Sequence, residues 1–474
     1  MAHRSGESRH QATLFPVLLD ELVDSESMVR VIDAWVHQLN LDVLGFSKAQ
    51  AHTMGRPPYH PGDLLRLYIW GYLNAVRSSR ALERECHRNV ECMWLLGRLA
   101  PDHKTIADFR RVHSQALVHV CASFVQFALS AKLISGHTVA IDGTKVRAVA
   151  SRSAIVSKAV LQQRHREQQA QIARYLNQLD EQDSRQPADC ANTKRIRAAL
   201  DAVRAQAQRT QTELEQLQSH QRSTLIQTEP QAQVMKSLHN APGYNLQTAV
   251  DTESHLVVHQ EVNSKANDST QLQPVAQAAA KVLSSPCKVV ADAGYANGEQ
   301  LAELEQQGII AYVAPNRAVN NQGEGNLLDR AAFIYSEDTD CYTCPQGKTL
   351  ARKQLMRAKK MVVYEARMQD CAQCSLKPQC TQAQQRFVSR HLFEQAHARN
   401  VQRLEVNPQM MTLRRQTVEH PYGTIKHQIL GNARLLMRGL TGAKAELSLA
   451  VLAYNLKRAM NMKGASWMLN ALRA

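Results

Sequence analysis

The stretch His137-Thr-Val-Ala-Ile-Asp-Gly-Thr144 leads a short apolar run into an aspartate, Asp142. A second stretch, Lys288-Val-Val-Ala-Asp-Ala-Gly-Tyr295, leads another apolar run into Asp292. Short apolar runs that are rich in β-branched residues and bounded by glycine indicate buried β-strands. A carboxylate that closes such a strand is held at the rim of the sheet, where open α/β sheets place their ligands. The two stretches therefore predict a buried sheet with aspartates at its rim.

The residues between and after these stretches alternate between strand and helix patterns. Tyr244 to Val250 alternates apolar and polar side chains, and a turn at Asp251-Thr-Glu-Ser254 and a β-rich run from His255 to Val262 follow, which predicts a hairpin. Antiparallel strands followed by β–α–β units favour an α+β fold with a mixed sheet flanked by helices. Further helices are expected over 271–283 and 298–307, and further strands over 289–290 and 309–313.

Residues 1–135 carry helical rather than strand patterns. Met28, Ile32, Trp35 and Leu39 recur at steps of four, three and four, which places them on one face of a helix. Pro61 opens a second helix, which is predicted from Asp63 to Val76 and whose first turn suits a proline. A third helix is predicted from Ser78 to His87, and a fourth after a start signal formed by Thr105 and Asp108.

Basic side chains are distributed over these helices, which short turns connect. Such an arrangement is typical of helix-turn-helix DNA-binding domains, although charge alone fits a helical bundle with solvent-facing arginines equally well. The formal net charge of the chain, +15 at pH 7, favours a polyanionic partner, because Lys and Arg contacts to phosphate release counterions. The candidate DNA contacts in this domain are Arg77, Arg80, Lys104, Arg110 and Arg111.

Length and composition bound the class of protein. A chain of 474 residues, of which 44% are hydrophobic, is long enough for two or three domains with sizeable cores. The N-terminus lacks a signal-peptide pattern, and the most apolar run, Leu64 to Val76, is interrupted by Arg66 and falls short of the ~18 residues of a membrane span. We therefore expect a cytoplasmic protein without a membrane partner, whose ten cysteines form no disulfide framework.

A long interruption, from about Ser151 to Lys236, separates the first two predicted strands. Two heptad-like patterns lie in it, and Asp183-Ser-Arg-Gln-Pro187 breaks them apart, which predicts an antiparallel helical hairpin. This hairpin is either an arm that contacts DNA or a second protomer, or a solvated coiled coil without contacts. The expected seam residues are His165, Gln169, Ile172, Leu176 and Leu179 on the first helix, and Ile196, Leu200, Val203, Ala207, Thr210, Leu214 and Leu217 on the second.

A third acidic residue, Glu419, lies in Arg415-Gln-Thr-Val-Glu-His-Pro-Tyr-Gly-Thr-Ile-Lys426. On a helix, Arg415, Glu419 and Lys426 share one face, so the two cations can hold phosphates beside the carboxylate. Pro421 removes a helical hydrogen-bond donor and can kink the helix, which makes the shared face approximate. The alternative is ordinary surface pairing of charges, which contributes only ~0.3–0.5 kcal/mol.

Five cysteines gather in the C-terminal half of the chain. Cys341-x2-Cys344 and Cys371-x2-Cys374 are two knuckles of the kind that close a tetrahedral Zn²⁺ site, and the segment 348–364 between them can form a strand pair. The gap between the knuckles exceeds the commonest ribbon spacing of about 15–20 residues. Redox-active thiols and a site without metal are the alternatives. The expected zinc ligands are Cys341, Cys344, Cys371 and Cys374, with Cys380 as a substitute ligand or a free thiol.

Four further stretches match one known family. They are Arg56-Pro-Pro-Tyr-His-Pro61, Pro101-Asp-His-Lys-Thr-Ile-Ala-Asp-Phe-Arg-Arg111, Gly243-Tyr-Asn-Leu-Gln-Thr-Ala-Val-Asp251 and Ala291-Asp-Ala-Gly-Tyr295. Arg415, Glu419 and Lys426 also follow the spacing of that family's Tyr-Arg-Glu-Lys signature, in which Thr412 stands at the tyrosine position. Over nearly its whole length the chain resembles bacterial insertion-sequence transposases of the DDE type.

The resemblance implies an RNase H-like catalytic domain over 136–465, with the hairpin over 151–236 and the Cys-rich part over 335–385 as insertions, behind a DNA-binding domain over 1–135. It implies that Asp142, Asp292 and Glu419 are catalytic, with Asp142 bridging two Mg²⁺ or Mn²⁺ ions and the other two each holding one. The implied activity is cleavage of double-stranded DNA at the element's terminal inverted repeats, followed by strand transfer into target DNA. Synapsis of two ends implies a homodimer on DNA at the bacterial nucleoid.

Three other functions fit parts of the pattern. A non-catalytic DNA-binding protein derived from such a transposase would bind DNA without cutting it. An RNase H-like nuclease would cut DNA without joining it, and a zinc-ribbon regulator would need zinc for binding. The set of three carboxylates in matching local contexts argues against the non-catalytic protein.

Overall fold

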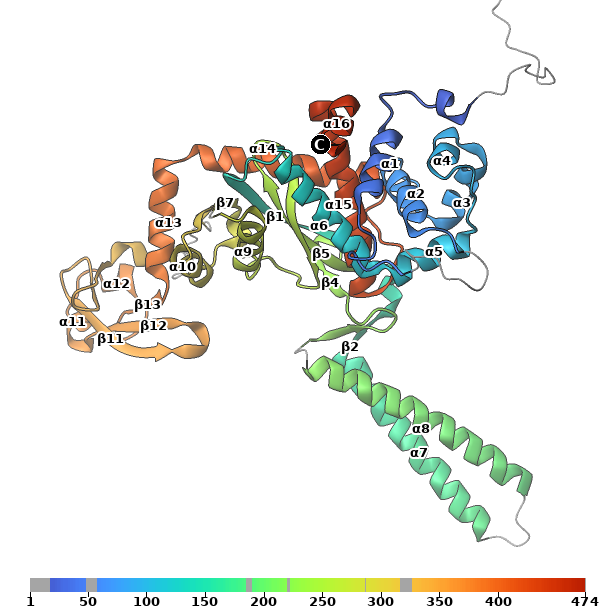
Figure 1. Cartoon of the computed structure of the whole chain (residues 1–474). Coiled ribbons are helices and arrows are strands. Elements are labelled where there is room, and N and C mark those ends of the chain that lie inside the picture. Colours follow the sequence, from blue (N-terminus) through green and yellow to red (C-terminus); the bar gives the residue numbers. More distant parts are fainter. Residues whose placement is uncertain are drawn as a thin grey trace, which may run out of the picture.

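The computed structural model describes residues 18–47, 58–184, 190–219, 222–285, 287–315 and 326–473. A mixed sheet lies at the centre of the molecule with helices packed around it (Figure 1). Its strands are β1 (Thr138–Arg147), β4 (Gln233–Met235), β5 (Ala241–Asp251), β6 (Val257–Asn263), β7 (Lys288–Ala291) and β8 (Ile310–Val313). β5 runs antiparallel to β1, β4 and β6, whereas β7 runs parallel to both β1 and β8. The predicted mixed sheet is confirmed.

The sheet has two differently covered faces, because successive side chains of a strand point to opposite sides. Val139, Ile141 and Val289 pack in the large core, to which α9 (Leu272–Leu283) and α10 (Gly298–Gln306) contribute. Ala140 and Val290 pack in a smaller core together with α13 (Glu394–Val406) and α14 (Gln409–Gly423). Even-numbered side chains of β1 and β7 therefore face α14.

One sequence-based expectation about β1 is wrong. Asp142 was expected to close its strand, but β1 continues to Arg147, because residues 139–147 all pair with β5. The pairing of β1 with β7 covers only residues 138–140. Asp142 therefore lies inside a strand, just beyond the point where its parallel neighbour ends. The expected hairpin of β5 and β6 and the helices and strands expected over 271–313 are confirmed.

In the described part of the chain, six α-helices precede the sheet and share one continuous core with it. The fourth predicted helix begins at His103 rather than after Thr105, because the Asp102 side chain caps it by accepting hydrogen bonds from the N–H groups of Lys104 and Thr105. Arg56 and Pro57 lie outside the described residues. The helices are α1 (Met28–Gln38), α2 (Pro61–Leu73), α3 (Ser79–Arg88), α4 (Val90–Leu95), α5 (His103–Val112) and α6 (Ser114–Ser130), of which α4 and α6 were not predicted.

A long C-terminal helix, α15 (Gly439–Lys463), joins these helices to the sheet. It is buried around most of its circumference and packs against α2, α6 and β6. The last helix, α16 (Ala465–Arg473), returns to α1. No single described helix is long and apolar enough to cross a bilayer, and α5 and α6 meet that criterion only as a pair bent by 73°.

The long insertion forms a helical hairpin that projects from the body, as predicted (Figure 1). Its helices α7 (Lys158–Asp183) and α8 (Cys190–Ser219) pack along each other above a short strand pair, β2 (Ile155–Ser157) and β3 (Thr224–Ile226). Residues 185–187 of the predicted break lie outside the described residues. The seam of α8 is confirmed at Leu200, Val203, Ala207, Thr210, Leu214 and Leu217, all of which are buried.

The seam of α7 agrees with the predicted one at His165, Ile172 and Leu179, which are half-buried, but not at Gln169 and Leu176, which are exposed. Leu161 is fully buried, and Gln168 and Tyr175 are half-buried in place of the two exposed residues. The heptad phase is set by Leu161, which packs against Leu214 and Leu217 in a separate small core at the base of the hairpin. The predicted pattern began at His165 and therefore did not include Leu161.

A second, five-stranded antiparallel sheet forms the Cys-rich part, at the far side of the molecule from the N-terminal helices (Figure 1). It has its own small core and is joined to the main sheet through α13. The strand pair expected over 348–364 is confirmed as β11 and β12. The elements are β9 (Ile334–Ser336), β10 (Cys341–Thr343), β11 (Thr349–Met356), β12 (Met361–Ala366), α11 (Met368–Ala372), α12 (Lys377–Cys380) and β13 (Phe387–His391).

Candidate active site

Asp142 and Asp292 lie side by side where β7 ends. The parallel register pairs Ala140 with Val290, and each aspartate follows two residues later in the sequence, Asp142 within β1 and Asp292 directly after β7. By alternation, both belong to the face that α14 covers. There, Nη2 of Arg414 lies 2.8 Å from Oδ2 of Asp142 and 3.3 Å from Oδ2 of Asp292. Two carboxylates from different strands therefore converge on one cationic nitrogen atom.

The face of α14 that meets the sheet carries Arg414, Val418 and Tyr422, at steps of four residues. Val418 is buried, and the hydroxyl of Tyr422 donates a hydrogen bond of 2.5 Å to the carbonyl oxygen of Asp142. The same hydroxyl lies 2.8 Å from Oγ1 of Thr248, the partner of Asp142 across the sheet. Sequence analysis missed Arg414 and Tyr422, and the spacing of four around an apolar valine is the signal that could have found them.

The pKa of the Asp142 carboxyl group is raised above its ordinary value. Its side chain is 18% exposed, and its Oδ1 accepts a hydrogen bond of 2.7 Å from the N–H of Gly143. Burial raises the pKa of Asp142 to about 6; Arg414 and the Gly143 N–H act to lower it, while Asp292 and Asp268 raise it. Two like charges at this spacing need a cation between them to remain ionised together.

A second polar cluster supports the site from the opposite face of the sheet. The carboxylate of Asp268 accepts hydrogen bonds from Lys145 Nζ at 2.8 Å, Asn245 Nδ2 at 2.8 Å and Gln247 Nε2 at 2.6 Å. The hydroxyl of Tyr295 donates to Gln247 Oε1 at 2.5 Å. These contacts tie β1, β5 and the turn after β7 together, so the segments that carry both aspartates are held rigidly.

Glu419 makes no polar contact with the two aspartates among the described residues. It is exposed on α14, and within the described residues no hydrogen bond or ion pair joins it to Asp142 or Asp292. Arg415 is also exposed, and its Nε donates only to the carbonyl oxygen of Met411, at 3.5 Å. The predicted trio is therefore brought together at two of its three positions.

Lys426 approaches the aspartates more closely than the other two signature residues. The α-helix continues through Pro421 to Gly423 and then widens into a π-helical turn over 424–429, so no sharp break occurs at the proline. Burial lowers the pKa of Lys426, and Asp142 acts to raise it. Lys426 is half-buried, whereas Arg415 and Glu419 are exposed, so the helix face predicted to be shared by Arg415 and Lys426 is changed by the wider turn.

The donor set of this site fits a hard cation only in part. Within the described ranges, no three Asp, Glu, His or Cys side chains are arranged to hold a metal ion. The two aspartates nevertheless present oxygen atoms, the ligands that Mg²⁺ and Mn²⁺ prefer, to a common cationic point. A divalent cation at that point would need Glu419 or water for its remaining ligands.

The basic residues predicted to contact DNA divide into two groups. Arg80, Lys104 and Arg111 are exposed, as DNA contacts must be. Arg77 and Arg110 are buried, with 9% and 7% of their surface exposed. In this structure they are therefore not accessible to DNA, contrary to the prediction. Arg77 is occupied by Glu446 at 2.8 Å, and Arg110 by the hydroxyl of Tyr72 at 3.2 Å.

Three of the five predicted cysteines, Cys344, Cys371 and the substitute Cys380, pack against the core of the small sheet. Burial raises the pKa of the Cys380 thiol; Arg386 acts to lower it, and Cys371, Cys374 and Cys344 act to raise it. Cys341 points away, because the adjacent Tyr342 fills the core, and its Sγ lies 3.0 Å from Thr339 Oγ1. The geometry favours Cys380 over Cys341 as a member of any thiolate site.

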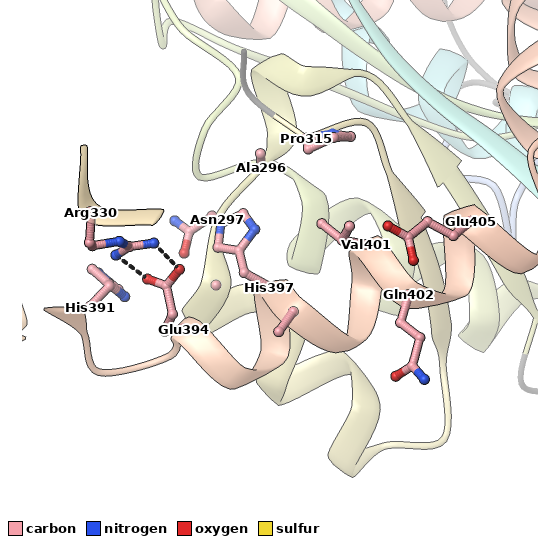
Figure 2. A pocket seen from close by; sticks show the side chains of 12 residues that line it. Ala296, Asn297, Pro315, Arg330, His391, Glu394, His397, Val401, Gln402 and Glu405 are labelled. Carbon is pink, nitrogen blue, oxygen red and sulfur yellow. Dashed lines mark hydrogen bonds and ion pairs between the residues drawn. The ribbon is translucent and has the colours of Figure 1, made fainter. Parts of the chain in front are cut away.

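The largest hollow near the Cys-rich part lies away from the aspartates. It is a cleft of about 820 Å³ between α10, α13 and the small sheet, and none of the predicted site residues lines it (Figure 2). Arg330 and Glu394 close one end with a two-pronged ion pair, in which the shortest distance is 2.6 Å (Figure 2). Because it lies where the helices of the main sheet meet the small sheet, we interpret this cleft as a gap between two separately packed parts of the structure.

Comparisons with known families agree with this geometry. A family model described as a transposase domain (DUF772) matches residues 17–112, and one described as a transposase DDE domain matches residues 192–456. The second match covers more than half of the chain and includes Asp292, Arg414 and Glu419, but it begins after the strand that carries Asp142. Searches of curated proteins and of solved structures returned no match.

Proposed function

The chain belongs to the transposases with a DDE domain, and we propose that it binds the terminal inverted repeats of an insertion sequence, cuts the DNA there and joins the cut ends to target DNA. The observation that carries this proposal is the convergence of Asp142 and Asp292 on one cationic atom at the edge of an RNase H-like mixed sheet. We expect the cleavage and joining reactions to take place in the cytoplasm, on a pair of DNA ends held by a homodimer.

The chemistry proposed for the site is divided among a few side chains. Asp142 and Asp292 would hold Mg²⁺ or Mn²⁺, with Glu419 completing the donor set. When bound, such ions stabilise charge on the attacking and leaving oxygens of a phosphodiester. Arg415 would bind a phosphate through two N–H groups and Lys426 as a point charge, which orients the scissile strand over the carboxylates.

The proposed DNA surface uses the exposed basic residues. Arg80, Lys104 and Arg111 lie on the N-terminal helices, outside the core that these helices share with the sheet. The projecting hairpin of α7 and α8 extends beyond the body and is positioned to reach DNA or a second protomer (Figure 1). A polyanionic partner fits the net charge of +15.

The first experiment is cleavage of a DNA fragment that carries the element's own ends, by the wild type and by Asp292→Ala, with Mg²⁺, Mn²⁺ or EDTA. We expect nicks at the ends that require the metal ion and that disappear in the variant, while DNA binding survives. A pre-cleaved end offered with a target plasmid then separates a transposase from a nuclease, since only a transposase makes joined product.

The rival proposal is a DNA-binding protein without catalytic activity. It is favoured by the lack of a polar contact between Glu419 and the aspartates among the described residues, and by the pairing of both aspartates with Arg414. Binding of the ends without cleavage, by both proteins and with either metal, would establish it in place of the transposase.

A structural zinc ion in the Cys-rich part is a separate proposal, with a revised ligand set. Zinc would draw together Cys344, Cys371, Cys374 and Cys380, which are not arranged as a complete metal site among the described residues. We expect about one zinc ion per chain in the purified wild type, measured by mass spectrometry, and a loss of that zinc in Cys380→Ser. Cys341→Ser is the matched control and should keep its zinc; the reverse result would restore the original ligand set.

A further inference from the structure

Arg414 occupies the point at which the two aspartates of the site converge. A single nitrogen atom, Nη2, contacts both carboxylates, at 2.8 Å and 3.3 Å. The side chain is 15% exposed, so the interaction is largely shielded from water. A cation in this position neutralises two carboxylates that would otherwise repel each other. Arg414 therefore links the two carboxylates of the site in this structure.

This contact leaves part of the hydrogen-bonding capacity of the Arg414 guanidinium unused. Arginine pairs best with carboxylates through two parallel N–H groups. Here Nη2 is shared between two carboxylates, and the buried Nε of Arg414 has no hydrogen-bond partner. A buried donor without a partner is costly. A divalent cation can therefore displace the Arg414 side chain from the two carboxylates, provided that the arginine finds another anion to bind.

A divalent cation and this guanidinium cannot share the same place. Any ion that binds both Asp142 and Asp292 must contact the oxygen atoms that Nη2 now contacts. We propose that Arg414 is a built-in competitor of the catalytic metal ion, which keeps the two aspartates paired until a divalent cation displaces it. This inference rests on the proposed function, because it concerns the regulation of the same site.

Displacement would also give Arg414 a new partner. An arginine that leaves two carboxylates at the edge of a DNA-binding surface is suited to a phosphate, which it can contact through two N–H groups. Metal ion and DNA then assist each other, since each stabilises the arrangement that the other needs. The protein without DNA is expected to bind the metal ion weakly.

The test is Mn²⁺ binding to the DNA-free protein, measured by electron paramagnetic resonance, in the wild type, Arg414→Gln and Arg414→Lys. Arg414→Gln removes a cation that contacts the same two carboxylates and repels a metal ion at that point, so at pH 8, above the pKa of about 6 of Asp142, it should bind Mn²⁺ about tenfold or more tightly than the wild type. Arg414→Lys keeps the positive charge and should stay close to the wild type. Arg415→Gln removes an equal charge one residue away and is the matched control, with little expected change.

The outcomes separate this inference from the proposed function. Unchanged or weaker Mn²⁺ binding by Arg414→Gln, with wild-type binding that Asp292→Ala abolishes, would overturn the competitor and leave the metal site intact. Absence of Mn²⁺ binding in every protein would overturn both. The melting temperature of each variant is measured with and without Mn²⁺, so that each is referred to its own metal-free state. Arg414→Met, which also removes the charge, replaces Arg414→Gln if that variant fails to fold.

Discussion

Replacing Glu419 by glutamine is expected to lower the rate of DNA cleavage about a thousandfold or more, because a catalytic metal ion contributes several kcal/mol to the transition state and loses a ligand. The fold should be unaffected. Glu419 is exposed on α14 and makes no hydrogen bond or ion pair among the described residues, so its replacement should change the free energy of unfolding by less than about 0.5 kcal/mol. A large loss of activity without a loss of stability is the signature of a functional carboxylate.

The matched control is Glu405→Gln, an exposed glutamate on the preceding helix, α13. Its cleavage rate and melting temperature should both equal those of the wild type. The measurement is the single-turnover rate of end cleavage, with the melting temperature recorded for each protein. Wild-type cleavage by Glu419→Gln would remove this residue from the site and leave Asp142 and Asp292 as the only carboxylates proposed for it.

Replacing Arg77 by alanine is expected to destabilise the protein by about 3–5 kcal/mol, since it leaves a buried charge without its partner. Arg77 Nη1 lies 2.8 Å from Oε1 of Glu446, which is fully buried on α15. Its Nη2 donates to the carbonyl oxygen of Leu430 at 2.6 Å. The other oxygen of Glu446 accepts hydrogen bonds from the N–H groups of Leu436 and Met437, at 2.8 and 3.0 Å. One ion pair therefore connects the N-terminal helices to the C-terminal segment that follows the active-site helix.

Urea unfolding of Arg77→Ala and Arg80→Ala measures this contribution. Arg80 is exposed, so its replacement should change the free energy of unfolding by no more than about 0.5 kcal/mol. The double replacement Arg77→Met with Glu446→Leu removes both charges. It should recover much of the lost stability, because no unpaired charge is left buried between the two segments. A loss below about 1 kcal/mol in Arg77→Ala would mean that the ion pair is not needed to hold the two parts together.

The strands, most helices and the family of this chain follow from local patterns in the sequence. Apolar alternation placed β5, β6 and β7, and helical spacing placed α1, α9 and α10, because the hydrophobic period of a segment is a property of that segment alone. The seam of α8 was predicted for the same reason. The apolar runs before Asp142 and Asp292 also predicted that both lie at the rim of a sheet, whereas the adjacency of the two parallel strands came from the structure.

Only the tertiary structure decided how those carboxylates are neutralised and which basic residues are accessible. Arg414 meets Asp142 across 272 positions of sequence, and Arg77 meets Glu446 across 369. A charge pattern cannot distinguish a buried arginine from a solvent-facing one, because the difference lies in which distant helix packs over it. Likewise, Cys380 rather than Cys341 packs against the small core, because Tyr342 fills that core and turns its neighbour outward. Sequence alone predicted candidate side chains for the chemistry, without Arg414 and Tyr422, and packing between distant segments decided their partners.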